Sequence, residues 1–203
     1  MALTRREVLW LGAGALFLLT GEAASAAELQ GLDQFGIAGP PCDAVAKTTP
    51  GVAREATFKA GSPARASLGE AGDRGVGLVL TGTVSGVTCG RIKGARVDFW
   101  QANERGVYDM TGFRFRGHQL TDTDGGYRLR TIIPGRVRDG RARHIGVNII
   151  VAGKADFWTE VFFPDDPADA RDPRFNTALV VKMPPGRPES TSRTATFDFV
   201  LNL

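Results

Sequence analysis

The sequence is poor in the side chains that most often carry out chemistry. Among its 203 residues only two are cysteine, two histidine and two tyrosine. Neither cysteine has a histidine near it in sequence, and there is no CxxC pair, so thiol catalysis is not supported. GxSxG, HExxH and P-loop patterns are also absent, and with them the motif signatures of serine hydrolases, zinc proteases and P-loop nucleotide-binding proteins.

The chain also lacks blocks of charge of one sign. Its 25 Lys and Arg residues are interleaved with 22 Asp and Glu residues, which leaves a net charge of +3. This pattern does not favour a nucleic-acid partner. The stretch from Asp122 to Gly125 resembles the start of a calcium loop, but the remaining acids of an EF-hand are missing, so we interpret it as a turn.

The N-terminal apolar run is too short to span a bilayer. Leu9–Thr20 holds about twelve residues, whereas a membrane-spanning helix needs roughly twenty. The run follows Arg5-Arg6 and precedes Ala24-Ser25-Ala26, which is the arrangement of a twin-arginine signal peptide and its cleavage site. We therefore expect residues 1–26 to be a leader that delivers the protein to the periplasm or outside the cell. An uncleaved anchor is the alternative, and we expect no stable membrane span after cleavage.

Export bears on the two cysteines, Cys42 and Cys89. In an oxidising compartment a disulfide between them is the expected state. Two separate buried thiols are the alternative.

Alternation of apolar and polar residues predicts a mainly β protein. Residues 27–75 show little periodicity and are interpreted as an irregular N-terminal arm, followed by a β-sandwich domain over residues 76–203. Short runs separated by Gly, Pro and Asp loops predict an antiparallel sandwich of about seven strands. The expected strands cover residues 78–84, 95–101, 127–132, 145–151, 157–163, 178–183 and 194–201. Helices are expected only as short pieces of the 164–177 loop.

Three segments, between residues 94 and 146, carry a family resemblance. They contain Trp100-Gln-Ala-Asn followed by Gly-Val-Tyr108, Thr121-Asp followed by Gly-Tyr127 and Pro134-Gly135, and Arg141-Ala-Arg-His144-Ile. In this order they resemble the WxANxxGxY, TDxxGxYxFxTIxPGxY and RxxHIH segments of the intradiol ring-cleavage dioxygenases. The resemblance implies a β-sandwich of the intradiol dioxygenase type and Fe(III)-dependent cleavage of catecholic aromatics by O₂. It also supports the disulfide, since exported relatives carry cysteines near positions 42 and 89.

The resemblance assigns four iron-ligand positions. Tyr108 falls on the first tyrosine ligand and His144 on the first histidine ligand. Val137 (or Arg138, if one residue is inserted) falls on the second tyrosine, and Gly146 falls on the second histidine. None of the side chains at Val137, Arg138 and Gly146 has an atom that can bind a metal. Because residues i and i+2 of a strand share a face, we expect room for an imidazole at Gly146.

Other residues could complete or assist the site. Asp139, just after the lost tyrosine, and Glu160, where the family carries a glutamine, offer hard carboxylate oxygens as substitute metal ligands. Arg141 matches a family arginine that stabilises negative charge on the substrate, although a surface role is equally open. Tyr127 matches a structural tyrosine, and His118 matches no ligand. Taken singly, Tyr108 and His144 are more typical of structural side chains than of metal ligands.

Two functions compete on these observations. The first is an exported ring-cleavage enzyme that binds a catecholic small molecule and holds iron through Tyr108, His144 and a substitute carboxylate. The second is a non-catalytic protein of the same fold, acting as a partner subunit of a homo- or hetero-oligomer or as a small-ligand-binding module. Loss of two ligand positions makes unaltered ferric chemistry doubtful.

Overall fold

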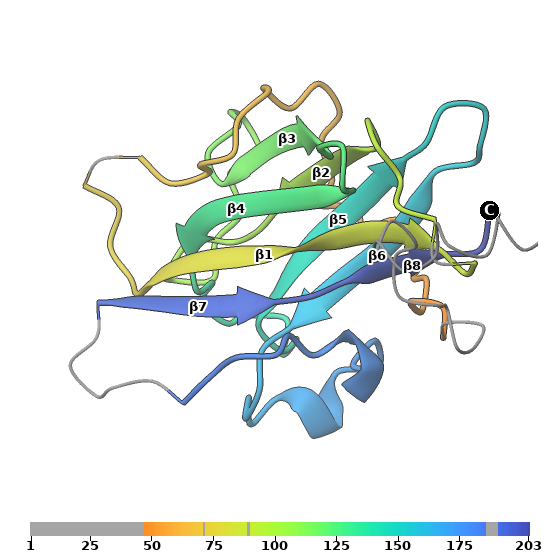
Figure 1. Cartoon of the computed structure of the whole chain (residues 1–203). Helices are drawn as coiled ribbons and strands as arrows, with labels where there is room; N and C mark the ends of the chain where they lie inside the picture. Colours follow the sequence, from red (N-terminus) through yellow and green to blue (C-terminus); the bar gives the residue numbers. More distant parts are fainter. Residues whose placement is uncertain (1–46, 71, 89, 186–190) are drawn as a thin grey trace, which may run out of the picture. The chain divides into compact units, whose positions relative to one another are not determined.

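The computed structural model describes residues 47–70, 72–88, 90–185 and 191–203. All of these residues belong to one compact unit (Figure 1). The expected leader over residues 1–26, the first part of the arm, Cys42 and Cys89 lie outside the described residues, so the leader and the disulfide stay predictions. Within the described ranges, no helix has both the length and the hydropathy needed to cross a bilayer.

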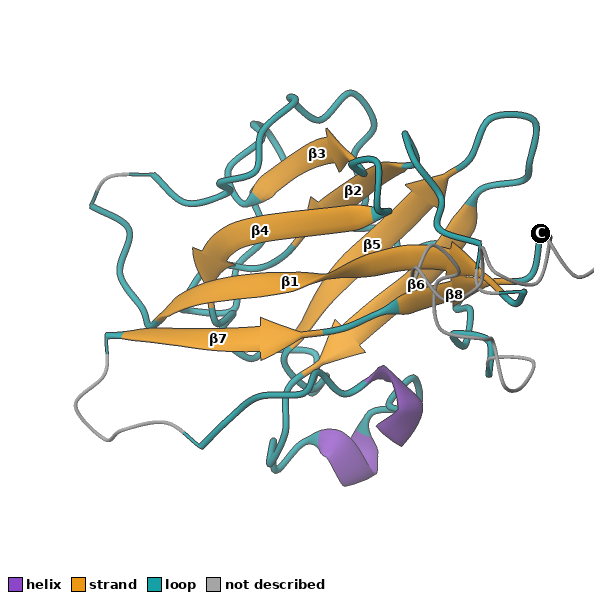
Figure 2. Cartoon of the chain, viewed as in Figure 1, coloured by secondary structure: helices purple, strands orange, loops and turns teal. Residues whose placement is uncertain are grey.

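The described residues form two four-stranded sheets (Figure 2). In the first, β1 is flanked by β4, β7 and β8; the second has the order β3-β2-β5-β6. The first sheet consists of β1 (Gly77–Gly86), β4 (Gly126–Ile132), β7 (Ser192–Thr196) and β8 (Phe199–Leu201). The second consists of β2 (Arg96–Trp100), β3 (Arg116–Leu120), β5 (His144–Ile150) and β6 (Phe157–Phe162). Two short 3₁₀ helices, η2 (Asp169–Arg171) and η3 (Thr177–Leu179), lie between β6 and β7 in sequence.

The hydrophobic core lies between the two sheets. Leu80 and Leu129 enter it from β1 and β4, and Val97, Phe99 and Val147 enter it from β2 and β5, each at most 1% exposed. Burying these apolar side chains is the main favourable contribution to folding. The predicted β-sandwich is therefore confirmed, although β1 pairs in parallel with both β7 and β8, so the pairing is not purely antiparallel.

The observed strands differ from the expected ones in three places. The expected strand over residues 178–183 is wrong, because that segment forms only isolated bridges, Val180 to Phe162 of β6 and Lys182 to Thr196 of β7. It links the edges of the two sheets and joins neither as a strand. The expected 194–201 strand is split into β7 and β8, which both pair with β1. Strand β3 was not expected, because its sequence Arg-Gly-His-Gln-Leu has no apolar alternation.

The arm crosses the outer face of the second sheet. The backbone N–H of Val52 donates to Trp158 of β6 (2.8 Å), and the N–H of Arg65 donates to His118 of β3 (2.9 Å). Because β6 and β3 are the two edges of this sheet, the residues between 52 and 65 span its width. They cover the face opposite to the core, and the candidate site lies beneath them.

Candidate functional site

Alternate residues of strand β5 face the core and the candidate site. Ile145, Val147 and Ile149 point into the core and are fully buried. His144 and Gly146 lie on the opposite face. Gly146 is paired with Trp100 of β2 on one side and with Glu160 of β6 on the other. Strand register therefore places an indole, a glycine and a carboxylate in one row next to His144.

Tyr108 and His144, the two predicted ligands, are brought together. The Tyr108 hydroxyl lies 2.9 Å from Nε2 of His144. Nδ1 of His144 lies 2.8 Å from the carbonyl oxygen of Ala142, so Nδ1 carries the proton and donates to it. Nε2 therefore faces the Tyr108 hydroxyl, with Oε1 of Glu55 at 3.4 Å and Nη1 of Arg141 at 3.3 Å.

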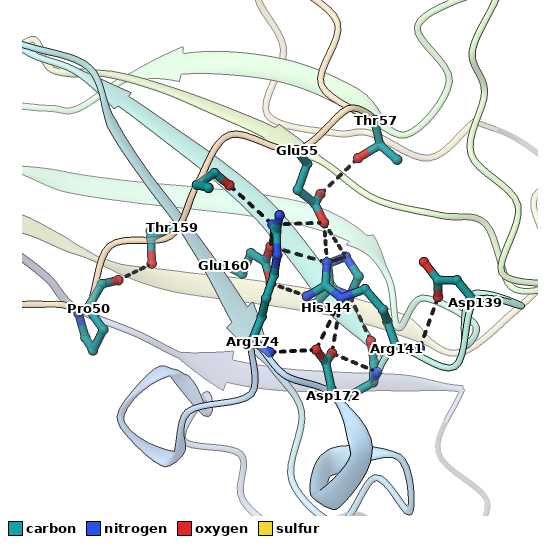
Figure 3. A network of polar contacts seen from close by, with 12 residues as sticks. Pro50, Glu55, Thr57, Asp139, Arg141, His144, Thr159, Glu160, Asp172 and Arg174 are labelled. Atoms are coloured by element: carbon teal, nitrogen blue, oxygen red, sulfur yellow. Dashed lines mark hydrogen bonds and ion pairs between the residues drawn. The ribbon is translucent and has the colours of Figure 1, made fainter.

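The Arg141 guanidinium joins three carboxylates (Figure 3). It forms short ion pairs with Glu55 and Glu160, and its Nε lies 3.3 Å from both oxygens of Asp172. Arg174 adds a second guanidinium, 2.8 Å from Oε1 of Glu160 and 3.7 Å from Oε1 of Glu55. The side chains of Glu160 and Asp172 are fully buried. We call Glu55, Arg141, Glu160, Asp172 and Arg174 the ion network.

The network changes the proton affinity of the groups it touches. Burial alone would raise the pKa of Glu55, but hydrogen bonding to His144 and the charges of His144 and Arg141 outweigh it and hold the pKa well below its usual value. Burial alone would lower the pKa of His144, yet the hydrogen bond and charge of Glu55 raise it. Burial and the charges of Glu55 and Glu160 raise the pKa of Tyr108 far above its usual value. These surroundings favour a neutral phenol at Tyr108.

The space beside Gly146 is filled. A Cβ atom at that position would lie 2.2 Å from Cε2 of Trp100, so the expected room for an imidazole is absent. The indole N–H of Trp100 donates to Oε2 of Glu55 (3.1 Å) and to the Thr57 hydroxyl (3.2 Å). Where the resemblance places a second imidazole, this chain therefore has an indole anchored to the arm.

The position of the second tyrosine opens on a surface cavity. Val137 is half-buried and lines a cavity of about 290 Å³ together with Arg136, Arg141 and Arg171. Arg138, the alternative position, is exposed. Asp139 is also exposed, and its Oδ1 accepts a hydrogen bond from the backbone N–H of Arg141 (3.0 Å). The structure thus brings Glu160 to His144, but it leaves Asp139 at the surface (Figure 3).

The remaining two candidate residues have separate places. The Tyr127 hydroxyl donates to the carbonyl oxygen of Phe197 (2.8 Å) within the core, a structural role. His118 lies on β3, where its Nδ1 is 2.8 Å from the carbonyl oxygen of Ser62. Of the four Tyr and His residues, only Tyr108 and His144 therefore share a site.

Sequence reasoning missed Glu55, Asp172 and Arg174. Glu55 lies in the arm, which has no periodicity to indicate a direction for its side chain, and the two others lie in the loop after β6. The available signal was the concentration of charge in that loop, where Asp172 is followed by Pro173 and Arg174. Loop charges alone do not reveal which residues become buried.

Comparison with known proteins identifies the family. The sequence model of a family described as "Dioxygenase" matches residues 49–202, about three quarters of the chain. The chain belongs to the intradiol ring-cleavage dioxygenase family. Among solved structures, the dioxygenase domain of a dioxygenase–carbohydrate-binding protein fusion from Streptomyces sp. SirexAA-E is 42% identical with a TM-score of 0.72. That similarity covers 77% of this chain and 99% of the other.

Curated members of the family match over shorter stretches. Hydroxyquinol 1,2-dioxygenase from Rhizobium sp. is 30% identical over 117 residues, which cover 46% of this chain and 40% of the relative. Catechol 1,2-dioxygenase 1 from Acinetobacter lwoffii is 42% identical over 64 residues, which cover 28% of this chain and 21% of the relative. This intradiol dioxygenase family member thus spans well under half of the curated relatives it matches.

Proposed function

We propose that this chain is an exported intradiol dioxygenase family member that carries no ferric centre and does not cleave catechols at a meaningful rate. The observation that carries the proposal is the position of the Arg141 guanidinium among Glu55, His144 and Glu160. A positively charged group in contact with the donors nearest His144 disfavours an iron ion there, because like charges repel.

The chemistry of the donor set supports this proposal. Two tyrosinates and two imidazoles would make Fe(III) a Lewis acid with an open position for a catecholate. Here Val137 and Gly146 offer no donor atom, and the Trp100 indole fills the space beside residue 146. The carboxylates of Glu55 and Glu160 are engaged by Arg141 and Arg174. The residues present therefore do not fit the family's iron, and we derive no reaction step through it.

We keep a non-catalytic role, as a partner subunit or small-ligand-binding module, as the second candidate function, and the ion pairs of Arg141 are the observation behind it. The resemblance implies that an arginine at the position of Arg141 is available to substrate. Here the guanidinium N–H groups of Arg141 are paired with Glu55, Glu160 and Asp172. An arginine neutralised in this way offers little charge to a catecholate.

Iron content tests the proposal. The mature protein, produced with ample iron, is expected to contain far less than one iron per chain, to lack a visible tyrosinate-to-iron absorption band, and to consume no O₂ with catechol, protocatechuate or hydroxyquinol. The control is Tyr108→Phe, which should match the parent in all three measurements. Stoichiometric iron with a visible band that Tyr108→Phe abolishes would overturn the proposal.

Export is tested separately through the leader. We propose delivery by the twin-arginine route, so exchanging both Arg5 and Arg6 for lysine should retain the protein in the cytoplasm. Normal delivery of that variant to the periplasm would contradict the assignment.

A further inference from the structure

We infer that Glu55, His144 and Glu160 form a latent divalent-cation site that the Arg141 guanidinium keeps closed. The inference rests on the proposed absence of a ferric centre, and it goes further by assigning a different ligand set, a different class of ion and a residue that excludes it. Two carboxylates and one imidazole suit ions such as Zn²⁺, Mn²⁺ and Co²⁺.

The donor atoms are spaced for a single ion. One ligand atom from each of Glu55, His144 and Glu160 lies within 4.8 Å of the other two, and all three residues are buried. Nε2 of His144 and Oε1 of Glu55 are 3.4 Å apart. Two donors that each bind zinc at about 2 Å, at a tetrahedral angle, lie roughly 3.4 Å apart. The third donor, a carboxylate oxygen of Glu160, lies within 4.8 Å of the other two, so we infer that its side chain moves toward the ion on binding.

Arg141 occupies the space between these donors. Its Nη1 donates a short hydrogen bond to Oε1 of Glu55 and lies 3.3 Å from Nε2 of His144 and 3.3 Å from Oε1 of Glu160. One guanidinium nitrogen therefore contacts all three donors. An ion placed among them would meet this charge directly, so the native arrangement excludes it.

The charge count indicates what removing Arg141 would do. Glu55, Glu160 and Asp172 contribute three negative charges, and Arg141 and Arg174 contribute two positive charges. With His144 neutral, as an imidazole that binds a metal must be, removing Arg141 leaves the three carboxylates facing Arg174 alone, so two negative charges in the buried site are uncompensated. Buried charge without a partner is costly, and a divalent cation supplies the missing two positive charges.

Cobalt titration of Arg141→Ala in the full chain tests the inference, because Co²⁺ reports coordination through visible absorption and binding through calorimetry. The parent should show no saturable Co²⁺ binding. Arg141→Ala should bind one Co²⁺ per chain, with a dissociation constant roughly a hundredfold or more below the highest Co²⁺ concentration at which the parent remains unsaturated. Adding His144→Gln to Arg141→Ala should abolish this binding. Arg141→Lys, which keeps a cation, and Arg128→Ala, at an exposed arginine of β4, should behave as the parent.

Folding of the variant provides a second measurement. If Arg141→Ala is unstable without metal, Co²⁺ should raise its melting temperature but leave that of the parent unchanged, since a ligand that binds the folded state stabilises it. Arg141→Gln, closer in size to arginine, should respond in the same way.

Three results would overturn the inference. The first is tight binding of Co²⁺ by the parent. The second is a folded Arg141→Ala or Arg141→Gln protein that binds Co²⁺ no better than the parent. The third applies if both variants are unstable without metal, and it is that Co²⁺ raises the melting temperature of neither. Each is distinct from failure of the proposed function, which would appear as iron with a tyrosinate band in the parent.

Discussion

The two faces of the β3-β2-β5-β6 sheet are built on different physical principles. The inner face carries Val97, Phe99 and Val147, whose burial is non-directional and tolerates any partner of suitable size. The outer face carries His144 and Glu160, which are just as buried but need specific partners from the arm and loops. The inner face therefore fixes the fold, while the outer face can change its chemistry as long as charges and hydrogen bonds stay satisfied.

The largest loss of stability is expected from removing a large apolar side chain from the inner face. Phe99 is 1% exposed and packs 5.5 Å, ring to ring, from Tyr127 of the opposite sheet. Phe99→Ala should lower the free energy of unfolding by about 3–5 kcal/mol because it leaves a cavity. Urea denaturation measures this. Leu120→Ala, at a residue 64% exposed on the same sheet, should change stability by less than about 0.5 kcal/mol; equal losses at both positions would contradict the placement of the core.

Glu160→Gln should have the next largest effect, on the outer face. The change keeps the shape of the side chain but removes the charge that faces Arg141 and Arg174, so stability should fall by about 3 kcal/mol in urea denaturation. The matched control is Glu70→Gln, where the side chain is 62% exposed and lies 3.9 Å from Arg65. That change should cost less than about 0.5 kcal/mol. A similar small loss at both positions would mean that the ion network is solvated.

Gly146→Ala tests the row of residues that joins the two neighbouring strands to β5. The added Cβ would meet the Trp100 indole at 2.2 Å, so we expect a loss of about 1–3 kcal/mol in thermal or urea unfolding. The loss should shrink in a Trp100→Phe background, because the two sites are in contact. Gly86→Ala is the matched control on β1, where the nearest heavy atom is 3.9 Å away. An equal loss in both backgrounds would exclude Trp100 as the cause.

Acid titration of the loop after Tyr108 should show the smallest effect. Hydrogen bonds from the backbone N–H groups of Gly112, Arg114 and Thr111 lower the pKa of Asp109 to about 2. A depressed folded-state pKa means that this stabilisation is complete above the unfolded value near 3.9 and is lost as the pH falls through about 2. The stability difference between the parent and Asp109→Asn should therefore shrink between about pH 5 and pH 2. A difference that does not vary with pH would contradict this role.

The sequence predicted the inner face better than the outer face for a physical reason. Alternation reveals which side of a strand is apolar, and this located β1, β2, β4, β5 and β6. Strand β3 was not predicted because an edge strand needs no continuous apolar pattern. The 178–183 segment was predicted as a strand because Leu179 and Val181 are both buried, which gives the alternation of a strand although the segment forms only isolated bridges. On the outer face, Tyr108 and His144 were found through motif resemblance, whereas Glu55 and Asp172 reach the site only through the tertiary path of the arm and a loop.

Anomalous X-ray diffraction at the iron edge, from crystals of the parent grown with iron, tests most directly what lies beside His144. We predict no iron peak within bonding distance of its Nε2, and density for the Arg141 guanidinium between Glu55 and Glu160. A strong iron peak bonded to Tyr108 and His144, with Arg141 displaced from the carboxylates, would contradict the proposal that the ion network replaces the ferric centre.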